Sequence, residues 1–151
     1  MSSIALALHV LCAVVWVGGM FFAYMALRPA AGLLDPGIRL PLWHNTFARF
    51  FPWVWACIVL LPSTGYLLIR ELFGGMAHAP LSVHIMHGLG WIMIGIFLFV
   101  FFRPYAGLRK AVGLKDFPSA GRHLTRIRQL ILTNLVLGVV ITIIAAGGRL
   151  A

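Results

Sequence analysis

Three of the six histidines lie inside long apolar segments, and they are the residues of this chain best suited to chemistry. His84 and His87 stand in the stretch SVHIMHGLGWIMIG, and His9 stands near the start of the chain. Neutral imidazole is a ligand for haem iron, copper and zinc. At about 100° per residue, His84 and His87 share one face of a helix, whereas Met86 points to the opposite side. A helical segment therefore cannot offer all three side chains to one ion, and we expect Met86 to serve packing.

His9, His84 and His87 are also expected at similar depth. His9 lies near the start of the first apolar segment, and the other two lie near the start of the third. Odd-numbered segments of an antiparallel bundle begin on the same side of the membrane, so histidines from two helices can meet there. The alternative is that each histidine hydrogen-bonds to a neighbouring carbonyl or to water. For the trio we favour a shared cofactor, because ionisable side chains within a membrane usually have a function.

Two cofactors fit this set of ligands. A haem b needs two axial imidazoles from facing helices, which predicts His9 and one of His84 and His87 as ligands, with the other histidine beside the site. Trp16, Phe21, Phe22, Trp91 and nearby glycines would then form the pocket walls. Such a protein would transfer electrons near the outer face, and a haem-dependent membrane oxidoreductase is one form of it.

Copper is the alternative. Cu(I) prefers soft sulfur ligands, and Cys12 lies one helical turn from His9, with Met20 and Met93 deeper in their segments. We nevertheless expect Cys12 and Cys57 to be small buried apolar residues that form no disulfide. A third hypothesis is an accessory subunit without a cofactor.

The elements that must position these residues follow from composition. Hydrophobic residues make up 62% of the 151 residues, charged residues 10%, and the mean hydropathy is +0.99. Soluble domains carry about 25% charged residues, so the surroundings of this chain are lipid. Four segments, about 4–27, 50–69, 82–102 and 129–147, approach the ~20 apolar residues that span a bilayer. Because lipid cannot satisfy backbone groups, each must be helical, which predicts an all-α membrane protein: one antiparallel four-transmembrane-helix bundle over residues 1–151.

Charge predicts the orientation. Ten Lys and Arg residues lie in the connections after the first and third segments, against Arg70 and Arg149 elsewhere. Such an excess marks the cytoplasmic side, so both termini and the 70–81 loop should face outward from a bacterial inner membrane. The net charge of +9 then needs no nucleic-acid partner. The expected partners are the lipid bilayer, a redox partner or quinone, and further copies of the chain in a homo-oligomer.

The connections carry their own signals. The first, DPGIRLPLWHNTFARF, predicts a short amphipathic helix lying in the interface. In the third, Asp116 or Ser119 could cap a helix of about 30 residues that begins near Pro118. Among the histidines of the connections, we expect interfacial or solvated positions for His44 and His123, and an outer-loop position for His78.

The chain resembles the small CopD-family membrane proteins, relatives of the membrane part of copper resistance protein D. The resemblance runs through LHVLCAVVWVGGMFFAYMALRPAAG, ARFFPWVWACIVLLPSTGYLLI, VHIM, RPYAGLRKAV and RIRQLILTNLVLGVVITIIAAGGR. Its most specific element is His9 seven residues before Trp16, with Gly18 and Gly19 following. The resemblance implies copper handling, and the family's third-span pattern favours His84 over His87 as the partner of His9. A weaker likeness to the haem-binding HemJ protoporphyrinogen oxidases lacks that family's intramembrane lysine.

Overall fold

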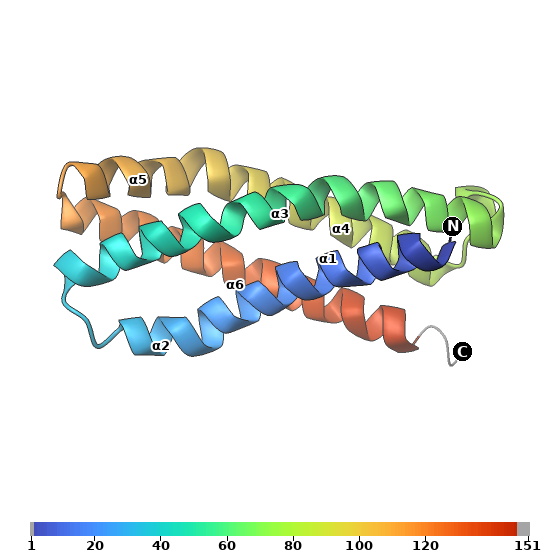
Figure 1. Ribbon diagram of the computed structural model, residues 1–151, viewed down its shortest axis with the longest axis horizontal. Helices are drawn as coiled ribbons and strands as arrows, with labels where there is room; N and C mark the ends of the chain where they lie inside the picture. The colour runs from blue at the N-terminus through green and yellow to red at the C-terminus, as the bar shows by residue number, and fades with distance from the viewer. Residues whose placement is uncertain (1, 148–151) are drawn as a thin grey trace.

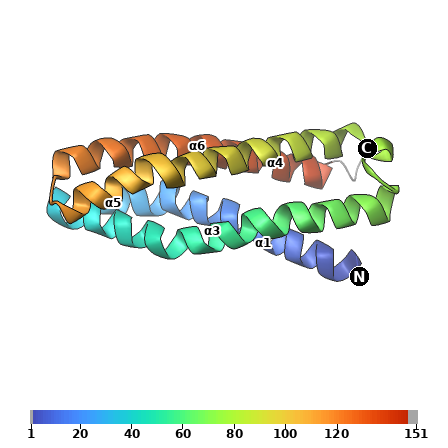
Figure 2. The ribbon, with the colours of Figure 1, turned by 90° about the horizontal axis from the view of Figure 1, so that it is seen from above.

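Two long antiparallel helical hairpins make up the part of the chain that the computed structural model describes, residues 2–147 (Figures 1 and 2). The first hairpin pairs α1 with α3, and the second pairs α4 and α5 with α6. The elements in chain order are α1 (Ser2–Phe22), η1 (Ala23–Leu27), α2 (Arg28–Ala31), α3 (Pro36–Phe73), η2 (Met76–His78), α4 (Leu81–Val100), η3 (Phe101–Tyr105), α5 (Ala106–Gly113) and α6 (Phe117–Gly147).

The predicted fold class is confirmed. Within residues 2–147, four helical stretches are long and apolar enough to cross a membrane: Ser3–Ala31, Pro36–Phe73, Leu81–Gly113 and Phe117–Gly147. Many large apolar side chains lie on their outer faces, which is expected where the solvent is lipid. The chain is therefore a multi-pass membrane protein. Its description as one domain over residues 1–151 stays a prediction.

The predicted interfacial helix in the first connection is wrong. α3 runs unbroken from Pro36 to Phe73 and contains three further prolines after its first residue, so the connection and the second span form one helix. The aromatic side chains that suggested an interfacial helix are instead buried in the protein, since Trp43 and Phe47 are each 1% exposed. An apolar face can be covered by lipid or by other helices, and here the extended ends of α5 and α6 cover it.

The third connection agrees with the sequence. The Asp116 carboxylate accepts a hydrogen bond from the backbone N–H of Ser119 at 3.1 Å, which is a side-chain cap at the start of a helix. The helix that follows, α6, has 31 residues against about 30 predicted. The preceding helical stretch continues through the wide turn η3, which contains Pro104, to Gly113.

The two ends of the bundle differ in composition. One end, here called the histidine end, holds the start of α1, the connection 74–80 and the end of α6 (Figure 1). The opposite end, called the basic end, holds the turns at 32–35 and 114–116 and the ten basic residues of the two connections. Arg149, predicted on the histidine side, lies outside the described residues. The orientation of the two ends in the membrane stays a prediction.

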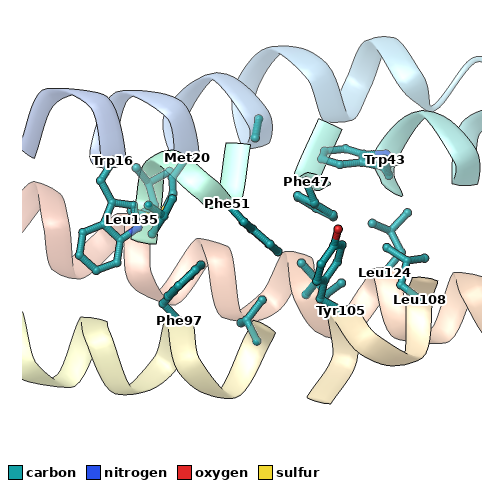
Figure 3. Close-up of a cluster of buried hydrophobic side chains, with 14 of the residues drawn as sticks. Trp16, Met20, Trp43, Phe47, Phe51, Phe97, Tyr105, Leu108, Leu124 and Leu135 are labelled. Atoms are coloured by element: carbon teal, nitrogen blue, oxygen red, sulfur yellow. The ribbon is translucent and has the colours of Figure 1, made fainter. Parts of the chain in front are cut away.

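A ladder of aromatic rings joins the two hairpins (Figure 3). Phe51 of α3 lies at its centre, with its ring centroid 5.1 Å from that of Phe47, 4.8 Å from that of Tyr105 and 5.4 Å from that of Phe97. Trp16 of α1 contacts Phe97 edge-on at 6.3 Å. In lipid, van der Waals contact of this kind holds helices together, since water supplies no hydrophobic drive between them.

Two glycines allow helices to approach closely. A Cβ atom at Gly19 would collide with the ring of Phe50, and one at Gly138 would lie 2.7 Å from a methyl of Val17. At these two positions the missing side chain lets a neighbouring helix come close. At Gly88 the space beside the backbone is open to at least 4 Å among the described residues, so no helix contact explains that glycine.

Candidate functional site

His9 points from α1 toward α3, and its hydrogen bonds define its tautomer. Its Nδ1 lies 2.9 Å from Oγ1 of Thr64. The Thr64 hydroxyl has one proton, which it donates to the carbonyl of Leu60 at 2.6 Å. Because that carbonyl can only accept, the hydroxyl must accept from His9, so Nδ1 of His9 carries the proton. The lone pair on Nε2 of His9 is left for another partner.

Cys12 and Cys57 meet one turn further along the same interface. Both thiols are free and buried, and they come from the neighbouring helices α1 and α3. The Cys57 thiol donates a hydrogen bond to the backbone carbonyl of Cys12 at 3.5 Å, which joins the two residues across the helix interface. The prediction of two buried cysteines without a disulfide is confirmed. Their pairing across the helix interface was not predicted.

We call the four residues His9, Cys12, Cys57 and Thr64 the thiol seam. On α1 the seam continues along one helical face, because residues spaced by three and four lie one above another. That face leads from His9 through Cys12 and Trp16 to Met20, of which the last three are buried. The seam thus combines imidazole and thiol groups between two helices without a carboxylate, and the thioether of Met20 follows on the same face of α1.

His87 has a different environment on α4. Its Nε2 accepts a hydrogen bond from the indole N–H of Trp91 at 3.1 Å, since an indole nitrogen can only donate. The Tyr66 hydroxyl lies 3.1 Å from the same Nε2. The only lone pair of the neutral ring is therefore already engaged, and the proton is on Nδ1. His84, one turn earlier, is exposed on the helix surface.

The three predicted ligands do not converge in this arrangement. His9 contacts Thr64 and His87 contacts Tyr66, so α3 lies between them, as Figure 2 shows for the ends of α1, α3 and α4. Within residues 2–147, no three side chains of His, Cys, Asp or Glu come together as a metal site. The assignment of His9, His84 and His87 as ligands, of haem or of copper, stays a prediction.

The predicted walls of a haem pocket are mostly on the outside of the bundle. Phe21, Phe22 and Trp91 are 56%, 61% and 48% exposed, and only Trp16 lies in the core. A cavity of about 140 Å³ lies near the middle of the bundle, but no histidine lines it. Its walls are apolar, except for Thr46 and Asn134. The haem hypothesis therefore gains no support from this packing.

Two histidines of the basic end are packed against other helices, which corrects the prediction of interfacial or solvated positions. The ring of His44 stacks on Tyr105 with centroids 6.0 Å apart, and its Nδ1 is buried. His123 of α6 fills the space beside Gly107 of α5. The reason is that the helices continue as a packed bundle beyond the predicted spans. His78, in η2, is exposed as expected.

The sequence held one signal for the thiol pair. Depth matching, applied to the histidines, applies equally to Cys12 and Cys57, because antiparallel neighbours place residues at equal depth in a regular register. The close approach of Gly19 to Phe50 fixes that register, and it is the one that brings Cys12 beside Cys57. The pair was not predicted because a buried cysteine is commonly an inert, small apolar residue, and each cysteine was therefore assigned to packing.

Comparison with known proteins agrees with the resemblance seen in the sequence. The chain matches the family model described as copper resistance protein D over residues 44–147, which covers α6, α5, α4 and most of α3. That range does not include the first span, which carries His9 and Cys12. No curated protein and no solved structure was found to match the chain. Four membrane-spanning helices and a family match over more than half of its length identify this chain as a member of the copper resistance protein D (CopD) family.

Proposed function

We propose that this protein binds copper(I) as cargo at the thiol seam, with Cys12 and Cys57 as the sulfur ligands. The observation that carries the proposal is the meeting of two buried free cysteines from neighbouring helices, where the Cys57 thiol donates to the backbone carbonyl of Cys12. Thiol sulfur is a preferred donor for Cu(I), and two sulfurs from separate helices can hold one ion without a third protein ligand. The family, linked to copper resistance, supports the same metal.

The charge balance of such a site suits a membrane interior. A bare cation in an apolar interior is strongly disfavoured, and so is an unpaired thiolate. When Cu(I) binds one cysteine as thiolate and the other as neutral thiol, one proton leaves and the occupied site is uncharged. No carboxylate is required, and none of the three acidic residues of the chain lies in the seam.

His9 is the proposed entry ligand. Its free Nε2 lone pair and its place one turn nearer the histidine end suit a first contact with the ion. The buried Met20, on the same face of α1, offers a softer site further in. The excess of arginine and lysine at the basic end supports an outward-facing histidine end, so copper would enter from outside.

Haem b ligated by His9 with His84 or His87 is the competing hypothesis from the sequence. It needs two facing imidazoles with free lone pairs. The lone pair of His87 is engaged by Trp91, and His84 is exposed on the surface of α4, on the other side of α3 from His9. We therefore favour copper. An absorption spectrum of the purified protein separates the two, because haem gives an intense Soret band and Cu(I), a closed-shell ion, gives no visible band.

X-ray absorption of the Cu(I)-loaded protein tests the proposed site directly. We expect sulfur neighbours from both cysteines around copper in the wild type and only that of Cys12 in Cys57→Ser. Met25→Leu is the matched control, since Met25 is an exposed sulfur side chain of η1, outside the seam. A copper shell of nitrogen and oxygen alone in the wild type would contradict the proposal.

A further inference from the structure

Two arginines from different elements, Arg28 and Arg128, line a narrow crevice near the basic end, here called the arginine pocket. It is lined by Ala23, Tyr24, Arg28, Trp43, Arg128 and Ile131, and these side chains leave no room for a water molecule between them. The Arg28 guanidinium lies over the ring of Tyr24, 4.7 Å from its centroid. Arg39 lies one turn before Trp43 on α3 and carries the same charge sign. Like charges repel at short range, so this cluster is complete only with a negative charge beside it.

No carboxylate supplies that charge to Arg128. Of the three acidic residues in the chain, Asp116 accepts the helix-capping hydrogen bond described above, and Glu71 lies in the last turn of α3 at the histidine end. The third, Asp35, immediately precedes α3, and its backbone carbonyl accepts from the N–H of Arg39. An anion from outside the chain therefore fits the cluster.

Trp43 gives independent evidence of a missing partner. It lines the same pocket and is only 1% exposed, yet its indole Nε1 has no hydrogen-bond partner among the described residues. A buried N–H without an acceptor loses the hydrogen bond that it made to water in the unfolded chain, so such groups are rare unless a ligand or water completes them. An oxygen of a bound anion is the acceptor that this donor lacks.

The neighbouring cavity indicates what else the ligand contains. The apolar cavity of about 140 Å³ shares two lining residues, Ala23 and Ile131, with the arginine pocket. Its other walls include Phe22, Leu27 and Phe50. Next to the arginines there is thus apolar space of the size that holds a small hydrocarbon. A ligand that fills both has an anionic head and an apolar tail.

We propose that this site binds an anionic glycerophospholipid, with part of an acyl chain in the adjoining cavity. Its phosphate contacts Arg28 and Arg128 and, once the exposed Arg28 side chain turns outward, the Trp43 N–H. Planar guanidinium groups bind phosphate oxygens in pairs, which gives the site geometric selectivity as well as charge. The place of the cluster at the end of the apolar helix segments agrees with the depth of lipid headgroups. The proposal does not depend on the proposed copper function.

Native mass spectrometry of the detergent-purified protein tests this site. Phosphatidylglycerol, phosphatidylcholine and inorganic phosphate are added separately. We expect retention of phosphatidylglycerol, and a loss of roughly fivefold in its affinity for each arginine removed, in Arg28→Gln and Arg128→Gln. The matched control is Arg122→Gln with Arg126→Gln, which removes two exposed charges from α6 at the same end. Trp43→Phe keeps a buried aromatic ring and removes the N–H. It should therefore weaken lipid binding while the charge of the site stays the same.

Several results would overturn the proposal. Equal retention of phosphatidylglycerol by the pocket variants and by the control would mean that the lipid binds the general basic surface. Displacement of the lipid by inorganic phosphate at similar concentration would make this a site for free phosphate. If the double arginine variant does not elute as a folded species, Arg28→Lys with Arg128→Lys keeps the charge and removes the paired hydrogen bonds. Unchanged binding in that variant and in Trp43→Phe would contradict the proposed contacts.

Discussion

The seam between α1 and α3 and the outer face of α4 hold the same kind of residue at the same end of the molecule, but in opposite surroundings. His9 points between helices, where Thr64 orients it and its Nε2 remains available. His87 lies toward the surface, where the N–H of Trp91 engages its Nε2. Residue type and depth are alike in both regions. The helix face on which a histidine lies, and its hydrogen-bond partner, therefore determine which imidazole is available as a ligand.

The difference between the two regions is tested most directly by removing the cysteines of the seam and the histidines of α4 in turn. We expect Cys12→Ser with Cys57→Ser to abolish stoichiometric Cu(I) binding, because serine oxygen is a hard, weak donor for this ion. His84→Ala with His87→Ala should leave the stoichiometry unchanged. Competition with a chromophoric Cu(I) chelator measures both variants against the wild type. The opposite result, with loss in the histidine variant only, would move the copper site to α4.

The sequence predicts those features of the two regions that depend on composition and on the helical repeat. Apolar length predicted four spanning helices, and Asp116 predicted the start of α6. Helix period placed His84 and His87 on one face. The neighbours of each face could not be predicted, because four antiparallel helices can be rotated about their axes without changing the apolar pattern. Contacts such as Gly19 with Phe50 fix the rotation, and they depend on shape.

The same reason explains why the interfacial helix predicted at the basic end was wrong. Trp43 and His44 lie in an amphipathic pattern, which is typical both of a helix at a lipid interface and of a helix packed against other helices. The choice depends on whether another helix extends far enough to cover them. That length is set by α5 and α6, more than sixty residues away along the chain, so local sequence does not contain it.

Thr64 provides a sharper test within the seam. Thr64→Val keeps the side-chain shape and removes the oxygen that accepts from Nδ1 of His9. Loss of a partner that orients a metal-binding histidine typically lowers metal affinity by about 10–100-fold, and we expect the apparent Cu(I) affinity to fall in that range if His9 contacts the ion. Thr64→Ser is the control, because it keeps the hydroxyl. An unchanged affinity in Thr64→Val would exclude His9 from the copper site.

The pH dependence of binding separates thiols from imidazoles. A protonated thiol releases one proton on binding Cu(I), so the apparent affinity should rise by about tenfold per pH unit between roughly pH 7 and 8, below the ordinary thiol pKa near 8.5. An imidazole site should be nearly flat there, since histidine is already neutral above its usual pKa of about 6.5. Chelator competition at several pH values measures the slope. A flat profile would favour histidine ligands over the cysteine pair.

The smallest expected effect is at Trp91, and it tests why His87 is not available. Trp91→Phe removes the N–H that engages Nε2 of His87 and keeps an aromatic ring on a surface that is 48% exposed. A hydrogen bond of this kind contributes about 0.5–1.5 kcal/mol, so the fold should be little changed. Copper stoichiometry and affinity should also remain as in the wild type, because the seam is on the other side of α3. The ¹⁵N resonance of His87 Nε2 should move, which reports the freed lone pair.

The control is Trp53→Phe, because Trp53 is an exposed tryptophan of α3 and its replacement removes an indole elsewhere on the surface. An increase in copper affinity in Trp91→Phe but not in Trp53→Phe would mean that the indole N–H had been masking a ligand on α4.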